Sequence, residues 1–178
     1  MPDQPPDLLA VPAFDQLDPA RAAAVLAPCC ASRRWADAVV AGRPHGDLAR
    51  LTVASDTAIG TLTWADLQEA LAAHPRIGAT LAGSGREAAW SAQEQRAAAA
   101  AGAAERDELA AASAAYEARF GHVFLIRASG RSAAEMLAAL RDRLGHDPAA
   151  EREVVRAELR GIVALRLARV LADGGTPR

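Results

Sequence analysis

Helix signals recur along nearly the whole chain, and this pattern limits the folds available to it. Capping residues precede the first turn of a predicted helix at Asp18-Pro19, Ser32, Thr63-Trp64-Ala65-Asp66, Ser132-Ala133-Ala134-Glu135 and Asp147-Pro148. Only the run from Phe120 to Ile126 is short, apolar and flanked by glycines, as a strand would be. One strand alone cannot form a sheet. The sequence therefore predicts an all-α fold, a single compact domain of about seven or eight helices with one short extended segment near residues 121–127.

Prolines, glycines and caps set the predicted boundaries. The helices are predicted from Pro19 to about Cys30, from Ser32 through Val40, from His45 to about Ser55, from Thr63 to His74, across the alanine-rich residues 86–119 with a break at Gly102, from Ser132 to about Leu144, and from Asp147 onward. Residues 1–12 are predicted to be a disordered or extended tail. Residues 13–173 would form the helical domain, and residues 174–178 a frayed tail.

Composition excludes several classes of protein. The chain has 178 residues and 51% hydrophobic residues, enough for one core, and its net charge of -2 offers no electrostatic basis for binding nucleic acid. No apolar run approaches the roughly 20 residues of a membrane span, and the acidic, proline-rich start is unlike a signal peptide. The adjacent Cys29 and Cys30 are expected to be reduced, partly buried helix residues, which favours a cytoplasmic location.

The candidate site is an imidazole followed, about one helix later, by a polar helix face. His74-Pro75-Arg76-Ile77-Gly78 ends one predicted helix, and the four histidines of the chain show no metal-ligand spacing. Ser91, Glu94 and Gln95 are spaced i, i+3 and i+4, so they share one face of a helix. An imidazole near a hydroxyl, a carboxylate and an amide is the set of groups that acid/base chemistry uses.

Each of these residues also has an ordinary structural interpretation. A histidine at a helix C-terminus interacts favourably with the helix dipole, and His-Pro is a common helix stop. The Ser91, Glu94 and Gln95 face could simply be solvated. His45, His122 and His146 are expected to be non-catalytic, and His122 is the one to reconsider because it lies in the extended segment.

In order along the chain, the motifs resemble those of the OHCU (2-oxo-4-hydroxy-4-carboxy-5-ureidoimidazoline) decarboxylases. The resemblance covers roughly Phe14 to Leu167. It rests on Phe14, on Trp35 with Arg43-Pro44, on the His74 to Gly78 and Ser91 to Gln95 motifs, on Tyr116-x-x-Arg119-Phe120-Gly121, on Phe124-Leu125-Ile126 and on Ile162-x-x-Leu165-Arg166-Leu167. The sequence departs from the family where Asp15 and Ser113 replace the usual asparagines, and neither change removes a chemical group from the proposed site.

The resemblance implies a helical homodimer that uses no metal and no organic cofactor. It implies catalytic roles for His74 and Glu94. It implies substrate contacts by Pro75, Ser91, Gln95, Arg166 and the backbone around Ile126. Arg169, one turn beyond Arg166, is the main competitor for the arginine's role, and Arg166 could instead be a surface residue of the last helix.

The implied activity is decarboxylation of OHCU to (S)-allantoin in urate breakdown. The substrate's ring carbonyl and imine groups can accept the electron pair that carbon dioxide leaves behind. The hypothesis is that His74 relays the proton, that Glu94 orients the imidazole or binds ureido N–H groups, and that Arg166 pairs with the anionic part of the substrate. The alternative is an inactive helical family member that serves as a binding or scaffold protein.

Overall fold

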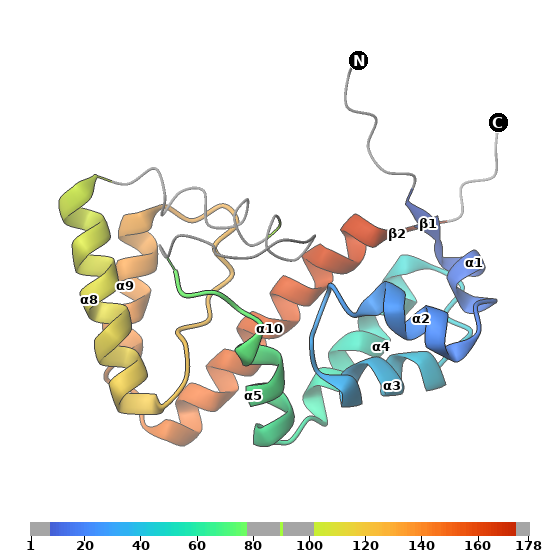
Figure 1. Cartoon of the computed structure of the whole chain (residues 1–178), viewed down its shortest axis with the longest axis horizontal. Coiled ribbons are helices and arrows are strands. Elements are labelled where there is room, and N and C mark those ends of the chain that lie inside the picture. The colour runs from blue at the N-terminus through green and yellow to red at the C-terminus, as the bar shows by residue number, and fades with distance from the viewer. Residues whose placement is uncertain (1–7, 78–89, 91–101, 174–178) are drawn as a thin grey trace, which may run out of the picture. The chain divides into compact units, whose positions relative to one another are not determined.

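The computed structural model describes residues 8–77, 90 and 102–173, and within these it confirms the all-α prediction. The chain forms two compact units, Met1–Asp66 with Arg160–Arg178, and Leu67–Leu159. The described residues contain the eight helices α1 (Val11–Asp15), α2 (Pro19–Leu26), α3 (Arg33–Ala41), α4 (Leu48–Gly60), α5 (Trp64–Ala72), α8 (Ala103–Phe120), α9 (Ala133–Arg143) and α10 (Pro148–Val170) (Figure 1).

The predicted caps form the expected hydrogen bonds. Asp18 accepts the backbone N–H of Arg21, and Ser32 accepts that of Trp35. A complete capping box joins Ser132 and Glu135 at the start of α9. The caps were predictable because they depend only on residues three positions apart.

In the first unit, the two ends of the fold meet in a short parallel sheet. β1 (Leu9–Ala10) pairs with β2 (Leu171–Ala172), with Leu9 opposite Leu171 and Ala10 opposite Ala172. Sequence reasoning missed this sheet, because strands of two residues have no periodicity to read. β1 and the first residues of α1 lie within residues 1–12, for which the sequence predicts a tail.

Asp15 and Arg43 hold the segment before α4 in the first unit. The Asp15 carboxylate accepts the backbone N–H groups of His45 and Gly46, at 3.0 and 2.8 Å. Arg43 donates to the carbonyls of Phe14, Asp15 and Leu17 at the end of α1. The Asp15 departure from the family pattern therefore has a structural role, since a carboxylate there can accept two backbone donors.

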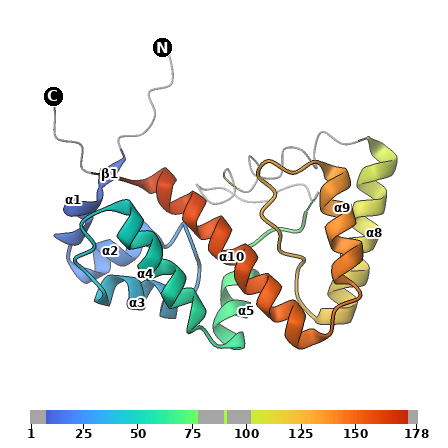
Figure 2. The ribbon, with the colours of Figure 1, turned by 180° about the vertical axis from the view of Figure 1, so that it is seen from behind.

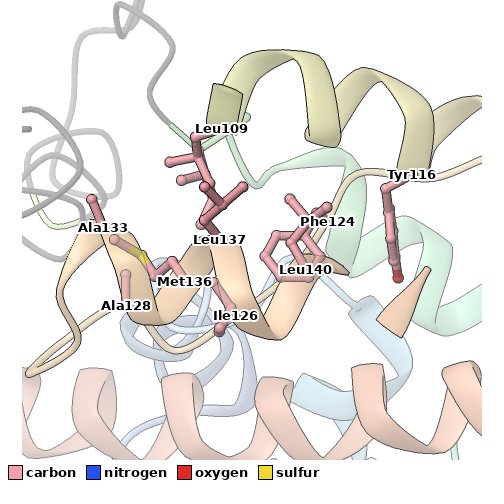
Figure 3. Close-up of a cluster of buried hydrophobic side chains, with 10 residues drawn as sticks. Leu109, Tyr116, Phe124, Ile126, Ala128, Ala133, Met136, Leu137 and Leu140 are labelled. Carbon is pink, nitrogen blue, oxygen red and sulfur yellow. The ribbon is translucent and has the colours of Figure 1, made fainter. Parts of the chain in front are cut away.

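The core of the second unit lies around α8 and α9, which pack side by side (Figures 1 and 2). Figure 3 shows the cluster, which includes Leu109 and Tyr116 from α8, Phe124 and Ile126 from the connecting segment, and Met136, Leu137 and Leu140 from α9. The α9 residues follow helical spacing, so one face of that helix is apolar. The segment after α8 forms no regular secondary structure, as predicted for residues 121–127.

Two helices differ from the prediction in where they begin or end. The helix expected from His45 to about Ser55 runs from Leu48 to Gly60, with Asp47 as its N-cap. Gly46 has φ of 82°, a left-handed conformation that a helix cannot contain, so α4 begins only after it. α2 ends at Leu26, so Cys29 and Cys30 lie after the helix rather than in it, and both are buried. Within the described ranges, no helix combines the length and apolarity needed to cross a membrane.

Candidate active site

His74 lies in the turn that follows α5. Its backbone N–H donates to the Leu71 carbonyl at 2.9 Å, and its side-chain Nδ1 is 2.9 Å from the carbonyl oxygen of Ala70. A carbonyl oxygen can only accept, so Nδ1 carries the hydrogen in this contact. The neutral ring then has its lone pair on Nε2, an atom that is buried from solvent. Residues before this histidine thus fix which nitrogen can take up a proton.

A paired arginine holds this turn against α8. Arg76 Nε and Nη2 donate to the two Glu117 carboxylate oxygens, both at 2.7 Å. The geometry is bidentate, which is the most directional form of an arginine–carboxylate pair. The hydrogen bond from Arg76, assisted by its charge, holds the pKa of Glu117 below its ordinary value, although partial burial opposes this. The same bond and the Glu117 charge raise the pKa of Arg76.

The same turn is attached to the core of the second unit. Ile77 is buried and belongs to the apolar cluster that also holds Phe124 and Ile126. The turn that carries His74 and the extended segment that carries Ile126 therefore pack into one cluster.

A cavity of about 240 Å³ lies between α5 and the start of the extended segment. It is lined by Gln68, Leu71 and Ala72 of α5 and by Gly121, His122 and Val123. Gly121 ends α8 with φ of 75°, which turns the chain sharply into this segment. The His122 and Tyr116 rings pack edge to face, with their centroids 5.4 Å apart. His122, the histidine that the sequence left open, thus borders a hollow in the same unit as His74.

A buried ionic network lies beneath the extended segment. Glu151 is fully buried and accepts hydrogen bonds from Arg143, at 2.5 and 2.9 Å, and from the Tyr116 hydroxyl. The second carboxylate oxygen of Glu151 is 2.9 Å from His146 Nδ1. The Arg143 guanidinium also lies over the Phe124 ring, 4.6 Å from its centroid. Such a network is stable only when its members are all satisfied, and each charge here has partners.

The network shifts the protonation equilibria of its members. Burial alone would raise the pKa of Glu151, but hydrogen bonds from Arg143 and Tyr116 outweigh it and hold that pKa below its ordinary value. Burial, together with the hydrogen bond to Glu151, raises the pKa of the Tyr116 hydroxyl. Glu151 is therefore a carboxylate and Tyr116 a neutral phenol at neutral pH.

The predicted site residues fall into three groups. His74, Pro75 and Ile126 lie in the second unit, where His74 and Pro75 are half-buried and Ile126 is buried. Arg166 lies on α10 in the first unit and is only 4% exposed, so its interpretation as a surface residue was wrong. Ser91, Glu94 and Gln95 lie outside the described residues.

Sequence reasoning missed the ionic partners around the site. Arg143 and Glu151 look like ordinary charges on two helix faces, and they are far apart from Tyr116 in sequence. Arg143 ends α9 and Glu151 lies in the first turn of α10, eight residues later. Nothing in that spacing indicates that the two charges are buried. In the described part of the chain, no group of three or more His, Cys, Asp or Glu side chains is arranged as a metal site.

Comparison with known proteins agrees with the sequence motifs. A family model described as OHCU decarboxylase matches residues 15–168. The chain is 35% identical over 148 residues to the uric acid degradation bifunctional protein TTL of Arabidopsis thaliana, which covers 82% of this chain and 46% of that protein. The chain thus spans about half the length of this curated relative.

Two solved structures share the fold. An OHCU decarboxylase crystallised in the presence of (S)-allantoin matches with a TM-score of 0.69 and 30% identity, over 80% of this chain and 94% of that one. An (S)-allantoin synthase matches with a TM-score of 0.69 over 92% of this chain and 54% of that one, and its 19% identity supports the fold alone. Because the family model spans most of the chain, the chain belongs to the OHCU decarboxylase family.

Proposed function

We propose that this chain decarboxylates OHCU to (S)-allantoin in urate catabolism, with His74 as the proton relay. The observation that carries the proposal is the hydrogen bond from His74 Nδ1 to the Ala70 carbonyl, in a chain whose residues 15–168 match the family. That bond leaves Nε2 as the atom able to exchange a proton. A neutral histidine with a fixed tautomer is suited to acid/base catalysis near neutral pH.

The proposed reaction balances without a redox partner. The bond between the ring carbon and the carboxylate breaks, and carbon dioxide leaves. The electron pair forms a double bond to the neighbouring carbon that bears the ureido group, the electrons of the imine move onto its nitrogen, and that nitrogen takes up one proton from water. The substrate hydroxyl loses its proton and becomes a carbonyl, while one proton is delivered to the ring carbon that bears the ureido group. His74 Nε2 would take the hydroxyl proton or supply the proton to carbon. Delivery from one side accounts for a single enantiomer of the product.

The remaining predicted residues would hold the substrate. Glu94 would orient the imidazole or bind ureido N–H groups, and Ser91 and Gln95 would donate to ring carbonyls. Pro75 and the backbone of Ile126 would line the substrate pocket. Arg166 would pair with the anionic part of the substrate, because a planar guanidinium offers two parallel donors to a carboxylate.

The test of this function uses freshly generated OHCU. The wild-type protein should produce optically active (S)-allantoin faster than the spontaneous decay, as followed by circular dichroism. His74→Asn should lower kcat by at least about 10²-fold, because general acid/base catalysis contributes roughly 10²- to 10⁴-fold. Product forming as a racemate at the background rate with the wild-type protein would support the scaffold alternative instead.

A matched histidine provides the control. His146 is also half-buried and also follows a helix end, and its Nδ1 contacts Glu151 rather than the turn that carries His74. His146→Asn should retain turnover within a few-fold of the wild type. Near-normal turnover by a folded His74→Asn variant would remove His74 from the mechanism. A homodimer is also proposed from the family resemblance, and a cytoplasmic location from the expectation that Cys29 and Cys30 are reduced.

A further inference from the structure

The two peptide groups on either side of Ile126 are each held by a charged side chain. Arg143 Nη1 donates to the Leu125 carbonyl oxygen at 2.8 Å. The backbone N–H of Arg127 donates to Glu158 Oε2 at 2.7 Å. Hydrogen bonds to ionised groups are roughly twice as strong as those between neutral groups. The backbone at Ile126 is therefore fixed on both sides by interactions stronger than those of an ordinary loop.

Arg143 and Glu158 both hold this backbone from one face of α10. Arg143 does so through its ion pair with Glu151, and Glu158 lies on that helix itself. Arg143 is paired with the fully buried Glu151, and Glu158 is paired with Arg131 at 3.3 Å. Glu151 and Glu158 are seven residues apart on α10, so they lie nearly in line along the helix. The extended segment is thus attached at two points along one helix.

Peptide planarity then decides where the polar groups of Ile126 point. In a trans peptide the C=O and the next N–H point in opposite directions, and Arg43-Pro44 is the one cis bond among the described residues. The Ile126 N–H therefore points away from the Arg143 guanidinium, because Leu125 O points toward it. The Ile126 carbonyl likewise points away from Glu158. One donor and one acceptor, from the same residue, are turned away from α10.

These two groups lie in a secluded place. Ile126 is only 5% exposed, and within residues 8–77, 90 and 102–173 neither its N–H nor its C=O takes part in a hydrogen bond. Buried backbone groups are nearly always paired, so an adjacent donor and acceptor in this state favour a ligand that supplies both partners. A ureide group, in which an N–H adjoins a C=O, has that pattern.

We infer that Arg143 and Glu158 are positioning residues that hold the Ile126 backbone as a donor–acceptor pair for the ureide group of the substrate. The inference rests on the proposed function and adds to it a means of recognition. Neither side chain needs to touch the substrate. Each acts by fixing the orientation of one peptide group, and the buried Glu151 carboxylate holds Arg143 in place.

Glu158 is the position at which to test the inference. Removing Arg143 would leave Glu151 buried without its charge partner, which can prevent folding. Glu158 is partly exposed, so Glu158→Ala is expected to fold. Glu158→Gln is the conservative variant, because its amide oxygen still accepts the Arg127 N–H. Glu108→Ala is the matched control, since it removes an exposed pair with Arg141 in the same unit.

The expected result is a rise in KM with little change in kcat. A substrate contact made equally in the ground and transition states affects KM alone. Loss of about one hydrogen bond corresponds to roughly a tenfold rise in KM for Glu158→Ala. Glu158→Gln should restore KM to within about threefold of the wild type, and Glu108→Ala should leave it unchanged. Adding (S)-allantoin should shift the Ile126 amide resonance of the ¹⁵N-labelled wild type, and less so in Glu158→Ala.

Three outcomes would overturn the inference. They are an unchanged KM in folded Glu158→Ala, a Glu158→Gln variant as impaired as the alanine variant, or an Ile126 amide resonance that ignores (S)-allantoin. A lowered melting temperature with normal KM would mean that Glu158 is structural only. If the wild type does not accelerate OHCU loss, the proposed function itself fails, and that result is seen before any variant is compared.

Discussion

At the residue scale, the site depends on partners that are close in space but not always in sequence. The fixed tautomer of His74 comes from Ala70, four residues earlier, so this local contact follows from a helical turn. The Arg76–Glu117 pair joins residues 41 positions apart, and nothing in the sequence selects Glu117 from the other acidic residues of its helix. Sequence reasoning located His74 and its turn, but it could not identify the residue that restrains the turn.

This pair provides a residue-scale prediction. Glu117→Gln should lower kcat/KM by about fivefold or less, because an exposed ion pair contributes modestly and the turn keeps its attachment through Ile77. The melting temperature should hardly change. Steady-state kinetics on OHCU would measure the effect, with Glu108→Gln as the control for an exposed pair elsewhere in the unit. Equal kcat/KM for the wild type and Glu117→Gln would mean that the pair does not restrain His74.

At the element scale, local signals predicted the helices and long-range contacts limited the prediction. The caps at Asp18, Ser32 and Ser132 formed as expected. The predicted start of α4 at His45 was wrong because Gly46 has φ of 82°, outside the helical region. Asp15, about 30 residues earlier, accepts the backbone N–H groups of His45 and Gly46 in this non-helical segment. The β1–β2 pair joins the two ends of the fold, which no local pattern can indicate.

The cap of α9 provides an element-scale prediction. Ser132→Ala should reduce the free energy of unfolding by about 1 kcal/mol, because it leaves the Glu135 backbone N–H without its acceptor. For a chain of this size that is roughly 2–4 °C in melting temperature. Ser132→Thr keeps a hydroxyl acceptor and should lose less. Thermal unfolding followed by far-ultraviolet circular dichroism measures both, and equal melting temperatures for Ser132→Ala and the wild type would contradict the assignment.

At the scale of the whole molecule, the buried network makes stability depend on pH at both extremes. The pKa of Glu151 is lowered, so its contribution is present above the ordinary value of 4.5 and is lost as pH falls through the lowered value. The pKa of Tyr116 is raised, so its contribution is present below the ordinary value of 10.0 and is lost as pH rises through the raised one. Stability should therefore be greatest between these limits.

Tyr116 is the single tyrosine in the chain, which gives this prediction a direct optical readout. In the native protein, tyrosinate absorbance should be absent at pH 10–11 and appear only as helical circular dichroism is lost. In denaturant the same phenol should ionise near its ordinary pKa of 10.0. Tyrosinate absorbance near pH 10 in a protein that retains its helical signal would show that the phenol is not held by Glu151.

The pairing of β1 with β2 has a topological consequence. Because Leu9 lies opposite Leu171 and Ala10 opposite Ala172, the first and last described residues lie at one corner of the first unit (Figure 1). Standard strand dimensions put Leu8 and Asp173 roughly 10–15 Å apart. A short tether could therefore close the chain into a ring, and new ends could be opened elsewhere, without displacing either half of this strand pair.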